Sequence, residues 1–267
     1  MGVVQALVLG IVQGLTEFLP VSSDGHLALA YRLFGSAPDL TFEVFLHLAT
    51  VLAMIVVFRA DIVTLARSFG PKGKGTAERR LAWLIVIATG VTGVLALAMK
   101  SVVEKANMSL LWIGLGFLVT AAALVVAEFA GRRAERRAPE DLGWPRAAGV
   151  AVAQALATLP GISRSGMTIS SGMLAGLDRP AAARFSFLLG MPIILAANIF
   201  EAKDVLTGAA PMPSPLVSAI GFLAAGISGY LAIRALLKFV QTRPLHVFAV
   251  YTSVMGILTI VAWALGA

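Results

Sequence analysis

The sequence predicts an all-α polytopic membrane protein, with about six transmembrane helices and two re-entrant helix pairs that form inverted-topology repeats. Three observations support this fold class. Of the 267 residues, 58% are hydrophobic and only 13% are charged, whereas soluble domains carry about 25% charged residues. Several apolar runs reach the roughly 20 residues that a helix needs to cross a bilayer. Two stretches, at 10–26 and 154–168, interrupt the apolar pattern with polar and turn-forming residues.

The first half of the chain begins with a broken pair of apolar segments. These segments, at 3–19 and 23–34, flank a turn-rich break at 20–25, and the second is too short to span a bilayer. Serine and aspartate in the break suit the capping of the second helix. Full crossings are predicted next, at 41–58, 81–99 and 109–129.

The second half repeats this pattern after a loop at 131–144 that is dense in arginine and glutamate. One short apolar segment ends at residue 159, a break follows, and another short segment ends at residue 177. Further crossings are predicted at 183–199, 215–237 and 245–265.

The two breaks also match each other in spacing, which supports an internal repeat. The step from Gln13 to Gly25 recurs unchanged from Gln154 to Gly166. Shared membrane composition is the alternative source of such a match. We therefore predict a single integral membrane domain over 1–267, with inverted repeats at about 1–130 and 145–267. Such repeats place their site at the repeat interface, where broken helices are shielded from lipid.

Basic residues gather in three loops and predict the orientation of the chain. The positive-inside rule places these loops in the cytoplasm and the two connections poor in lysine and arginine outside. The net charge of +7 is therefore assigned to a multi-pass inner (plasma) membrane protein and not to nucleic-acid binding, which would need interleaved aromatic residues. The absence of cysteine excludes disulfides and thiolate metal sites. The basic residues of the three loops are Arg59, Arg67, Lys72, Lys74, Arg79 and Arg80; Arg132, Arg133, Arg136, Arg137 and Arg146; and Arg234, Lys238 and Arg243.

The ionisable residues in the two breaks predict one site for an anionic head group, because charges at membrane depth are costly unless they serve a function. The carboxylate of Glu17 suits Mg²⁺ or Ca²⁺, which bridge to phosphate oxygens. The planar guanidinium of Arg164 matches phosphate. Hydroxyls and glycines of the second break line a helix N-terminus, which favours a phosphate. The candidate phosphate-binding residues are Ser22, Ser163, Arg164, Ser165 and Thr168.

A nucleophilic serine is also predicted in the first break. Ser22 or Ser23 could attack if a base were near, and His26 follows Ser23 at a spacing that permits contact on one helical turn. The alternative is that the serines are helix caps and His26 a structural hydrogen-bonding residue. For His47 and Glu43, on the next helix, packing or capping is preferred over a supporting role in the site.

The two motifs resemble those of the undecaprenyl pyrophosphate phosphatase family, the bacitracin-resistance membrane phosphatases. The likeness rests on QGLTEFLPVSSDGH at 13–26 and PGISRSGMTIS at 160–170, with FEV at 42–44 and FSFLL at 185–189. It implies hydrolysis of undecaprenyl (C55) diphosphate to undecaprenyl phosphate, which recycles the lipid carrier for peptidoglycan synthesis. It also implies a divalent cation and an active site that opens to the outer, periplasmic face.

Carried over by position, the resemblance implies roles for individual residues. It makes Glu17 the metal ligand, with Gln13 and Asp24 as further candidates. Two positions depart from the family pattern, which has Glu in place of Gln13 and Thr in place of Asp24. We hypothesise that these two departures compensate, with Asp24 supplying the carboxylate that Gln13 lacks. The catalytic residues that the resemblance implies are Glu17, Ser23, His26 and Arg164. The attacking group is either Ser23 or an activated water.

An alternative function from another class is a transporter or flippase for polyprenyl phosphate. Such a protein would keep the head-group pocket and show weak phosphatase activity or none, and both the repeat and Gln13 favour considering it. A membrane scaffold has little support, because it leaves Arg164 unexplained. The sequence leaves a monomer and a homodimer both open.

Overall fold

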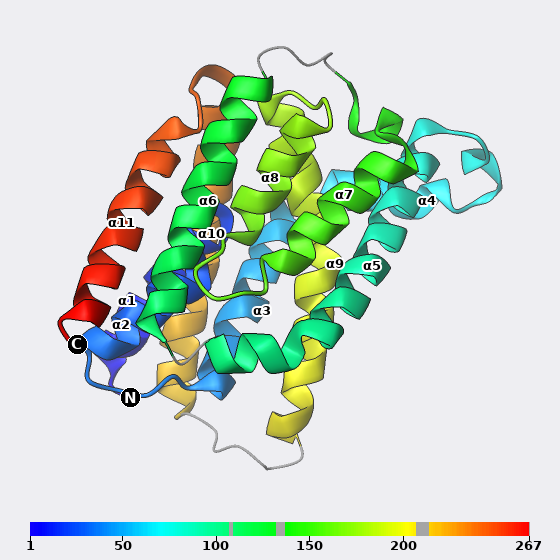
Figure 1. Cartoon of the computed structure of the whole chain (residues 1–267). Coiled ribbons are helices and arrows are strands. Elements are labelled where there is room, and N and C mark those ends of the chain that lie inside the picture. The colour runs from blue at the N-terminus through cyan, green and yellow to red at the C-terminus, as the bar shows by residue number, and fades with distance from the viewer. Residues whose placement is uncertain (107–108, 132–136, 207–213, 267) are drawn as a thin grey trace.

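The chain forms a bundle of helices (Figure 1) in a computed structural model that describes residues 1–106, 109–131, 137–206 and 214–266. Eleven α-helices and two 3₁₀ helices lie in these ranges. The α-helices are α1 (Val3–Phe18), α2 (Ser23–Leu33), α3 (Leu40–Val57), α4 (Arg59–Ser68), α5 (Ala77–Ala106), α6 (Leu110–Gly131), α7 (Gly143–Leu156), α8 (Arg164–Leu174), α9 (Arg179–Leu206), α10 (Pro215–Thr242) and α11 (His246–Ala264). The 3₁₀ helices are η1 (Pro71–Gly73) and η2 (Pro139–Asp141).

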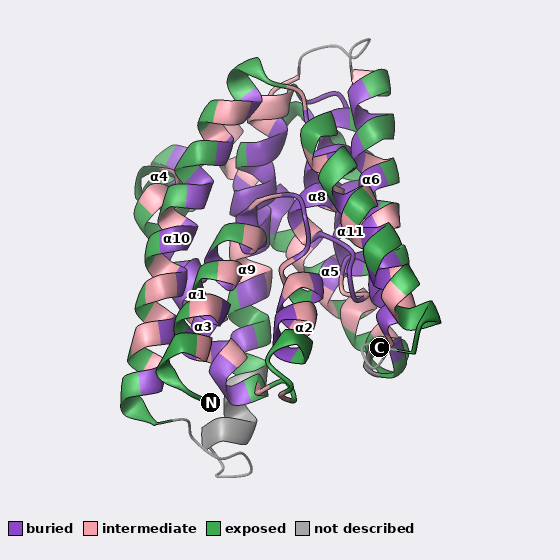
Figure 2. Cartoon of the chain, turned by 90° about the vertical axis from the view of Figure 1, so that its left-hand side faces the viewer, coloured by how far each residue is buried: buried purple, intermediate pink, exposed green. Residues whose placement is uncertain are grey.

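Six helices in the described part of the chain are long and apolar enough to cross a membrane, which confirms the predicted number of spans. They are α3, α5, α6, α9, α10 and α11. Their outer faces suit lipid: on α10, Leu223, Ile227 and Leu231 follow one another at four-residue steps and are each about 60% exposed. Figure 2 shows the complementary pattern, with buried residues concentrated around α8 and the break that precedes it.

The helix α4 is not predicted from the sequence, in which the basic residues after residue 58 indicate a loop. Its short length and polar composition hide it from a search for membrane spans. The helix is favoured by Asp61 in its first turn and Arg67 in its last, since these charges oppose the helix dipole. Asp61 also forms an ion pair with Arg184 at the start of α9.

Some predicted boundaries differ from the observed ones. Both α5 and α9 extend several residues beyond the predicted crossings at 81–99 and 183–199, because their polar flanking residues continue the helix. The predicted loop residues Arg132, Arg133 and Arg136, and the side chain of Lys203, lie outside the described residues.

The short helices pack against long helices from the other half of the chain. The helix α1 lies along α10, and α7 lies along α5. The helix α8 packs between α6 and α9, while α6 and α11 form a further closely packed pair. Figure 1 shows these segments side by side, with blue elements beside orange ones. This packing brings the two breaks in the chain into the interior of the bundle.

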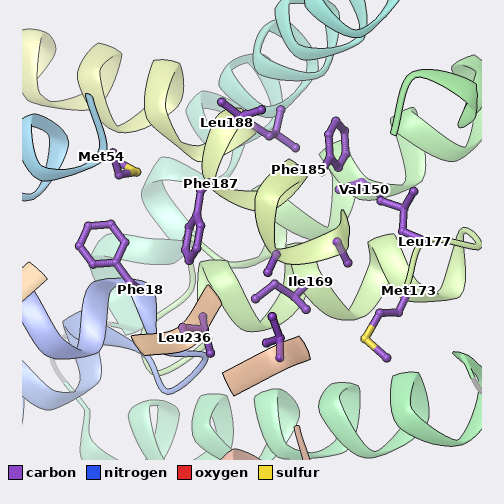
Figure 3. Packing of buried hydrophobic residues seen from close by; sticks show 14 of the residues in the cluster. Phe18, Met54, Val150, Ile169, Met173, Leu177, Phe185, Phe187, Leu188 and Leu236 are labelled. Atoms are coloured by element: carbon purple, nitrogen blue, oxygen red, sulfur yellow. The ribbon is translucent and has the colours of Figure 1, made fainter. Parts of the chain in front are cut away.

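A cluster of buried apolar residues joins the two halves beside the breaks (Figure 3). Phe18, at the end of α1, meets Phe187 of α9 edge to face, with ring centroids 5.8 Å apart. Phe58 lies at the same centroid distance from Phe187. Within a membrane, such contacts stabilise the bundle through close van der Waals packing, since lipid is as apolar as the rings. The cluster therefore holds the end of α1, and with it the neighbouring Glu17, against α9.

The break between α7 and α8 lies directly against the backbone of α6. Gly161 has φ of +78°, a conformation that side chains other than glycine rarely adopt. A Cβ atom at this position would also overlap the carbonyl of Ile113 on α6, and one at Gly116 would overlap the carbonyl of Pro160. On the other side, Gly25 of α2 approaches the Cα of Gly161, where a Cβ would lie at 3.3 Å. The first break and the second are thus neighbours.

A buried ion pair holds the C-terminal end of α6, away from the residues that contact the second break. The carboxylate of Glu128 is 5% exposed and accepts two hydrogen bonds from Arg179, of 2.7 and 2.5 Å. The backbone N–H of Leu245 donates to the same carboxylate at 2.7 Å. One side chain thereby connects α6, α9 and the start of α11.

Candidate active site

The two breaks end in the same local structure, a serine that caps the following helix. The Oγ of Ser22 accepts a hydrogen bond from the backbone N–H of Gly25 at 3.3 Å, and α2 begins one residue after Ser22. The Oγ of Ser163 accepts from the N–H of Gly166 at 3.0 Å, and α8 begins at Arg164. Both are N-cap hydrogen bonds. The residues directly after the caps, Ser23 and Arg164, therefore start their helices at equivalent places.

Glu17 and Arg164, which were expected to face one phosphate, form a direct ion pair across the two halves of the chain. The Nη2 of Arg164 donates to Oε1 of Glu17. The side chain of Glu17 is 4% exposed and that of Arg164 is 21% exposed. Glu17 ends α1, which is not among the six candidate spans. Burial on its own raises the pKa of Glu17, but the charges of Arg164 and His47 outweigh burial and hold this pKa below its ordinary value.

The second oxygen of Glu17 receives two further hydrogen bonds. The Oγ of Ser23 donates to Oε2 at 2.6 Å, and Nε2 of Gln13 donates to the same oxygen at 3.1 Å. Gln13 is fully buried, and its Oε1 has no hydrogen-bond partner. Glu17 is thus the group placed to accept the proton of Ser23, and Gln13 leaves one buried oxygen available beside it.

The His26 ring is engaged at both nitrogens, and neither contact is with Ser23. Its Nδ1 lies 2.7 Å from the carbonyl oxygen of Ser22. Its Nε2 lies 2.7 Å from the hydroxyl of Tyr251 on α11. Phe117 meets the ring edge to face, with centroids 5.1 Å apart. The predicted contact between Ser23 and His26 on one helical turn is therefore replaced by contacts with Ser22 and Tyr251.

His47 lies between the two carboxylates of the first motif. Its Nε2 is 3.9 Å from Oε2 of Glu17 and 4.0 Å from Oδ1 of Asp24. Its Nδ1 lies 3.0 Å from the carbonyl oxygen of Glu43, and because a carbonyl only accepts, Nδ1 carries a proton. The side chain of Asp24 is 58% exposed. The structure thus places Asp24 at the open edge of the site, with His47 between it and Glu17.

The hydroxyls of the second motif are buried and bind neighbouring groups. The Oγ atoms of Ser163 and Ser165 are 3.1 Å apart, and Ser165 donates to the carbonyl of Leu19 at 3.0 Å. The Oγ1 of Thr168 donates to the carbonyl of Arg164 at 2.8 Å and lies 2.5 Å from Oγ of Ser186. These contacts tie the start of α8 to the end of α1 and to α9, and so they position Arg164.

A pocket of about 650 Å³ lies apart from these residues. It is bounded by α4, the start of α5, η2 and the start of α9. Its lining includes the carboxylates of Asp61, Glu78, Glu140 and Asp178, and no residue of the two motifs. This pocket is separate from the candidate active site.

Comparison with known proteins supplies the decisive observation. A family model described as bacitracin resistance protein BacA matches residues 6–258. A protein named undecaprenyl-diphosphatase from Rubrobacter xylanophilus is 42% identical over 92% of this chain and 93% of its own length. Relatives with the same name from Myxococcus xanthus and Methanosphaera stadtmanae are 40% and 37% identical, and cover 98% and 97% of this chain and 89% and 97% of their own lengths.

The chain belongs to the BacA, or undecaprenyl-diphosphatase, family. The match covers both breaks and all six candidate spans except the last residues of α11. The resemblance inferred from the two motifs is therefore confirmed at the level of the whole chain.

Three residues of this BacA-family site were not found from the sequence. Tyr251 contacts His26, Ser186 contacts Thr168, and Oγ1 of Thr120 accepts a hydrogen bond from the N–H of Ser163 at 2.8 Å. Each lies within a long apolar helix. Polar residues in spans usually face a protein interior, and that is the one sequence signal that the three share.

Proposed function

We propose that this chain is an undecaprenyl-diphosphatase, which hydrolyses undecaprenyl (C55) diphosphate to undecaprenyl phosphate and inorganic phosphate. The hydrogen bond from Ser23 to Glu17 carries the proposal, because it joins a hydroxyl to a carboxylate that can accept its proton. The other oxygen of Glu17 binds Arg164. A nucleophile, its base and a cationic group for the phosphate thus lie in one continuous chain of contacts.

The reaction proceeds in two steps. In the first, Oγ of Ser23 attacks the terminal phosphorus while its proton passes to Oε2 of Glu17. The bond from phosphorus to the bridging oxygen breaks, and undecaprenyl phosphate leaves with the proton that Glu17 returns to that oxygen. In the second step, water attacks the phosphoserine and gives a proton to Glu17. Inorganic phosphate leaves as Glu17 returns this proton to Oγ of Ser23.

Arg164 supplies the positive charge that this transfer needs. A guanidinium has five N–H donors, and the contact with Glu17 uses Nη2, so the remaining donors are available to phosphoryl oxygens. Arg164 is also the first residue of α8, whose N-terminal dipole favours an anion. Phosphoryl transfer depends mainly on such positioning and charge stabilisation.

The donor set also fits a divalent cation, Mg²⁺ or Ca²⁺, completed by the substrate. The unpartnered Oε1 of Gln13 lies beside Glu17, and the exposed carboxylate of Asp24 lies across the site. Mg²⁺ often takes one or two carboxylates together with substrate phosphates, so it would need few ligands from the protein. When bound, the ion would neutralise charge that develops on the phosphoryl oxygens.

The proposal includes inverted repeats with re-entrant pairs, and a site open to the outer face. The packing of α1 on α10 and of α7 on α5 supports the repeat. In the proposed repeat α1 corresponds to α7 and α5 corresponds to α10, so the two contacts are equivalent. The shared N-cap structure at Ser22 and Ser163 supports it as well. The basic loops predict which side is the cytoplasm, and cysteine labelling at Asp24→Cys in the cysteine-free chain would test the side of the site.

The function is tested by phosphate release from C55 diphosphate by purified protein, with and without Mg²⁺ or Ca²⁺. We expect turnover with a cation and a loss of at least about a hundredfold in Ser23→Ala. Ser101→Ala, at an exposed position of α5, is the matched control and should retain full turnover. Substrate labelled at the terminal phosphate should leave label on the quenched wild-type protein but not on Ser23→Ala.

Two outcomes would overturn parts of this proposal. No turnover under any cation would reject the enzyme and favour a transporter or flippase for polyprenyl phosphate. Turnover without protein-bound label, retained in Ser23→Ala, would make water the direct nucleophile and reject the phosphoserine.

A further inference from the structure

Tyr251 is the one residue of the last helix that reaches the candidate site through a described hydrogen bond. It lies on α11, and its hydroxyl is 2.7 Å from Nε2 of His26. The two rings are nearly parallel, with an interplanar angle of 7° and centroids 5.6 Å apart. Tyr251 thus lies beside His26 with its ring nearly parallel to the imidazole and its hydroxyl at Nε2.

These contacts define the tautomer of His26. The carbonyl of Ser22 can only accept a hydrogen bond, so Nδ1, which lies 2.7 Å from it, carries the proton. In the neutral ring, Nε2 is then an acceptor, and the hydroxyl of Tyr251 is its donor. The other tautomer would direct the lone pair of Nδ1 at the carbonyl oxygen of Ser22, which is unfavourable.

The hydrogen bond to Ser22 acts on the residue next to the proposed nucleophile. Ser22 has φ of +72°, which is uncommon for any residue other than glycine and costs about 1–3 kcal/mol unless the surroundings hold it. The N–H of His26 also donates to the carbonyl of Ser22 at 3.3 Å. His26 therefore holds this turn twice, and the turn directs Ser23 at Glu17.

We infer that Tyr251 is a positioning residue: by donating to Nε2 it holds the His26 ring in place, with Nδ1–H directed at the carbonyl of Ser22, and His26 in turn holds the Ser22 turn that presents Ser23. Because Nε2 is occupied, His26 does not take the proton of Ser23, and Glu17 remains the acceptor. This inference rests on the proposed function for its effect on rate, but the state of the His26 ring can be measured without any turnover.

The first test is ¹⁵N NMR of histidine-labelled protein in lipid bilayers. The chain has three histidines, so the signal of His26 can be assigned by difference with His47→Gln and His246→Gln. We expect wild-type His26 to be neutral with the proton on Nδ1. In Tyr251→Phe, which keeps the ring at a position that is 44% exposed, Nε2 should lose its hydrogen-bond shift and the Nδ1–H signal should broaden, because the ring is no longer held at both nitrogens.

The second test is kinetic. Loss of one neutral hydrogen bond should lower kcat of Tyr251→Phe by about three- to tenfold, with a KM for C55 diphosphate within about twofold of wild type, because the hydroxyl contacts His26 and not the substrate. Tyr230→Phe is the matched control, since its hydroxyl contacts only the exposed Arg234 among the described hydrogen bonds, and both its kcat and its histidine spectrum should stay unchanged. In a His26→Gln background, Tyr251→Phe should have no further effect on kcat.

Each arm can overturn the inference. A wild-type His26 with its proton on Nε2, or a spectrum that Tyr251→Phe leaves unchanged, would show that the hydroxyl does not donate to Nε2 and does not hold the ring. An equal loss of kcat in the His26→Gln background would show that Tyr251 acts on another group. If wild-type protein released no phosphate, the proposed function would be wrong. The NMR experiment would still show whether the hydroxyl of Tyr251 donates to Nε2 of His26.

Discussion

The ion pair between Glu17 and Arg164 allows stability and catalysis to be separated by substitution. Glu17→Gln keeps the shape of the side chain and removes its charge. The Glu17 side chain is 4% exposed and that of Arg164 is 21% exposed, so the variant leaves a largely enclosed guanidinium without a counter-ion. Removing one partner of a buried pair costs about 3–5 kcal/mol. Because Arg164 is partly exposed, water partly screens its charge, and we expect a loss of unfolding free energy at the lower end of this range, about 3 kcal/mol.

The same substitution removes the proposed proton acceptor of Ser23. We expect phosphate release by Glu17→Gln to fall by about 10²–10⁴-fold, the usual contribution of a positioned base. The double variant Glu17→Gln/Arg164→Met removes both charges. Its stability should return to within about 1 kcal/mol of wild type, because an apolar replacement of a buried pair is often neutral. Its activity should stay lost, since neither base nor phosphate-binding cation is restored.

Denaturant unfolding in detergent micelles measures the first quantity, and phosphate release from C55 diphosphate measures the second. Arg164→Met completes the double-mutant cycle, and Ser101→Ala controls for purification. The reasoning is refuted if Glu17→Gln unfolds at the wild-type denaturant concentration. It is also refuted if the double variant is no more stable than Glu17→Gln, because the cost would then not come from an uncompensated charge.

Three further substitutions test other contacts. Asp24→Thr should lower cation-dependent phosphate release by about tenfold or more, and adding Gln13→Glu should restore it; full activity of Asp24→Thr alone would end the compensation hypothesis. Glu128→Gln should lower the unfolding free energy by about 2–3 kcal/mol. An unchanged denaturation midpoint would show that the contacts of Glu128 with Arg179 and Leu245 do not stabilise the fold. Gly161→Ala should lower the unfolding free energy by at least about 1 kcal/mol more than Gly143→Ala does. Both glycines have positive φ, but only Gly161 lies against the backbone of another helix. Equal shifts of the melting temperature in the two variants would contradict this explanation.

The spans could be predicted because the bilayer simplifies the problem: apolar length alone identified the six candidate spans. Charged groups within apolar segments are costly unless they serve a function, so Glu17 and Arg164 could be assigned to one site across the two halves. Their direct ion pair could not be predicted, because each was expected to act on the phosphate or its cation instead of on the other. The helix α4 could not be found in this way, because its stability comes from charges at its ends and packing on α5, not from lipid-compatible length.

The contacts of the serines and of His26 depend on the turn, and helical spacing misled the prediction there. A three-residue step predicts contact between Ser23 and His26 only if both lie in one regular helix with their side chains on one face. Both residues do lie in α2, but Ser23 is its first residue and its Oγ turns back to Glu17 near the end of α1. Tyr251 lies 225 residues from His26 in the chain, and no local pattern relates them.

The apolar surroundings of the ion pair serve the proposed chemistry as well as the fold. Phe18, directly after Glu17, is fully buried against Phe187, so water is excluded from one side of the carboxylate. In such a setting a fixed charge interacts more strongly than in water. That strength would be harmful for an isolated carboxylate, which would take up a proton, but Arg164 keeps Glu17 ionised and ready to accept from Ser23. The guanidinium therefore has two consecutive tasks, first to hold the base in its charged form and then to stabilise the phosphoryl group as that base becomes protonated.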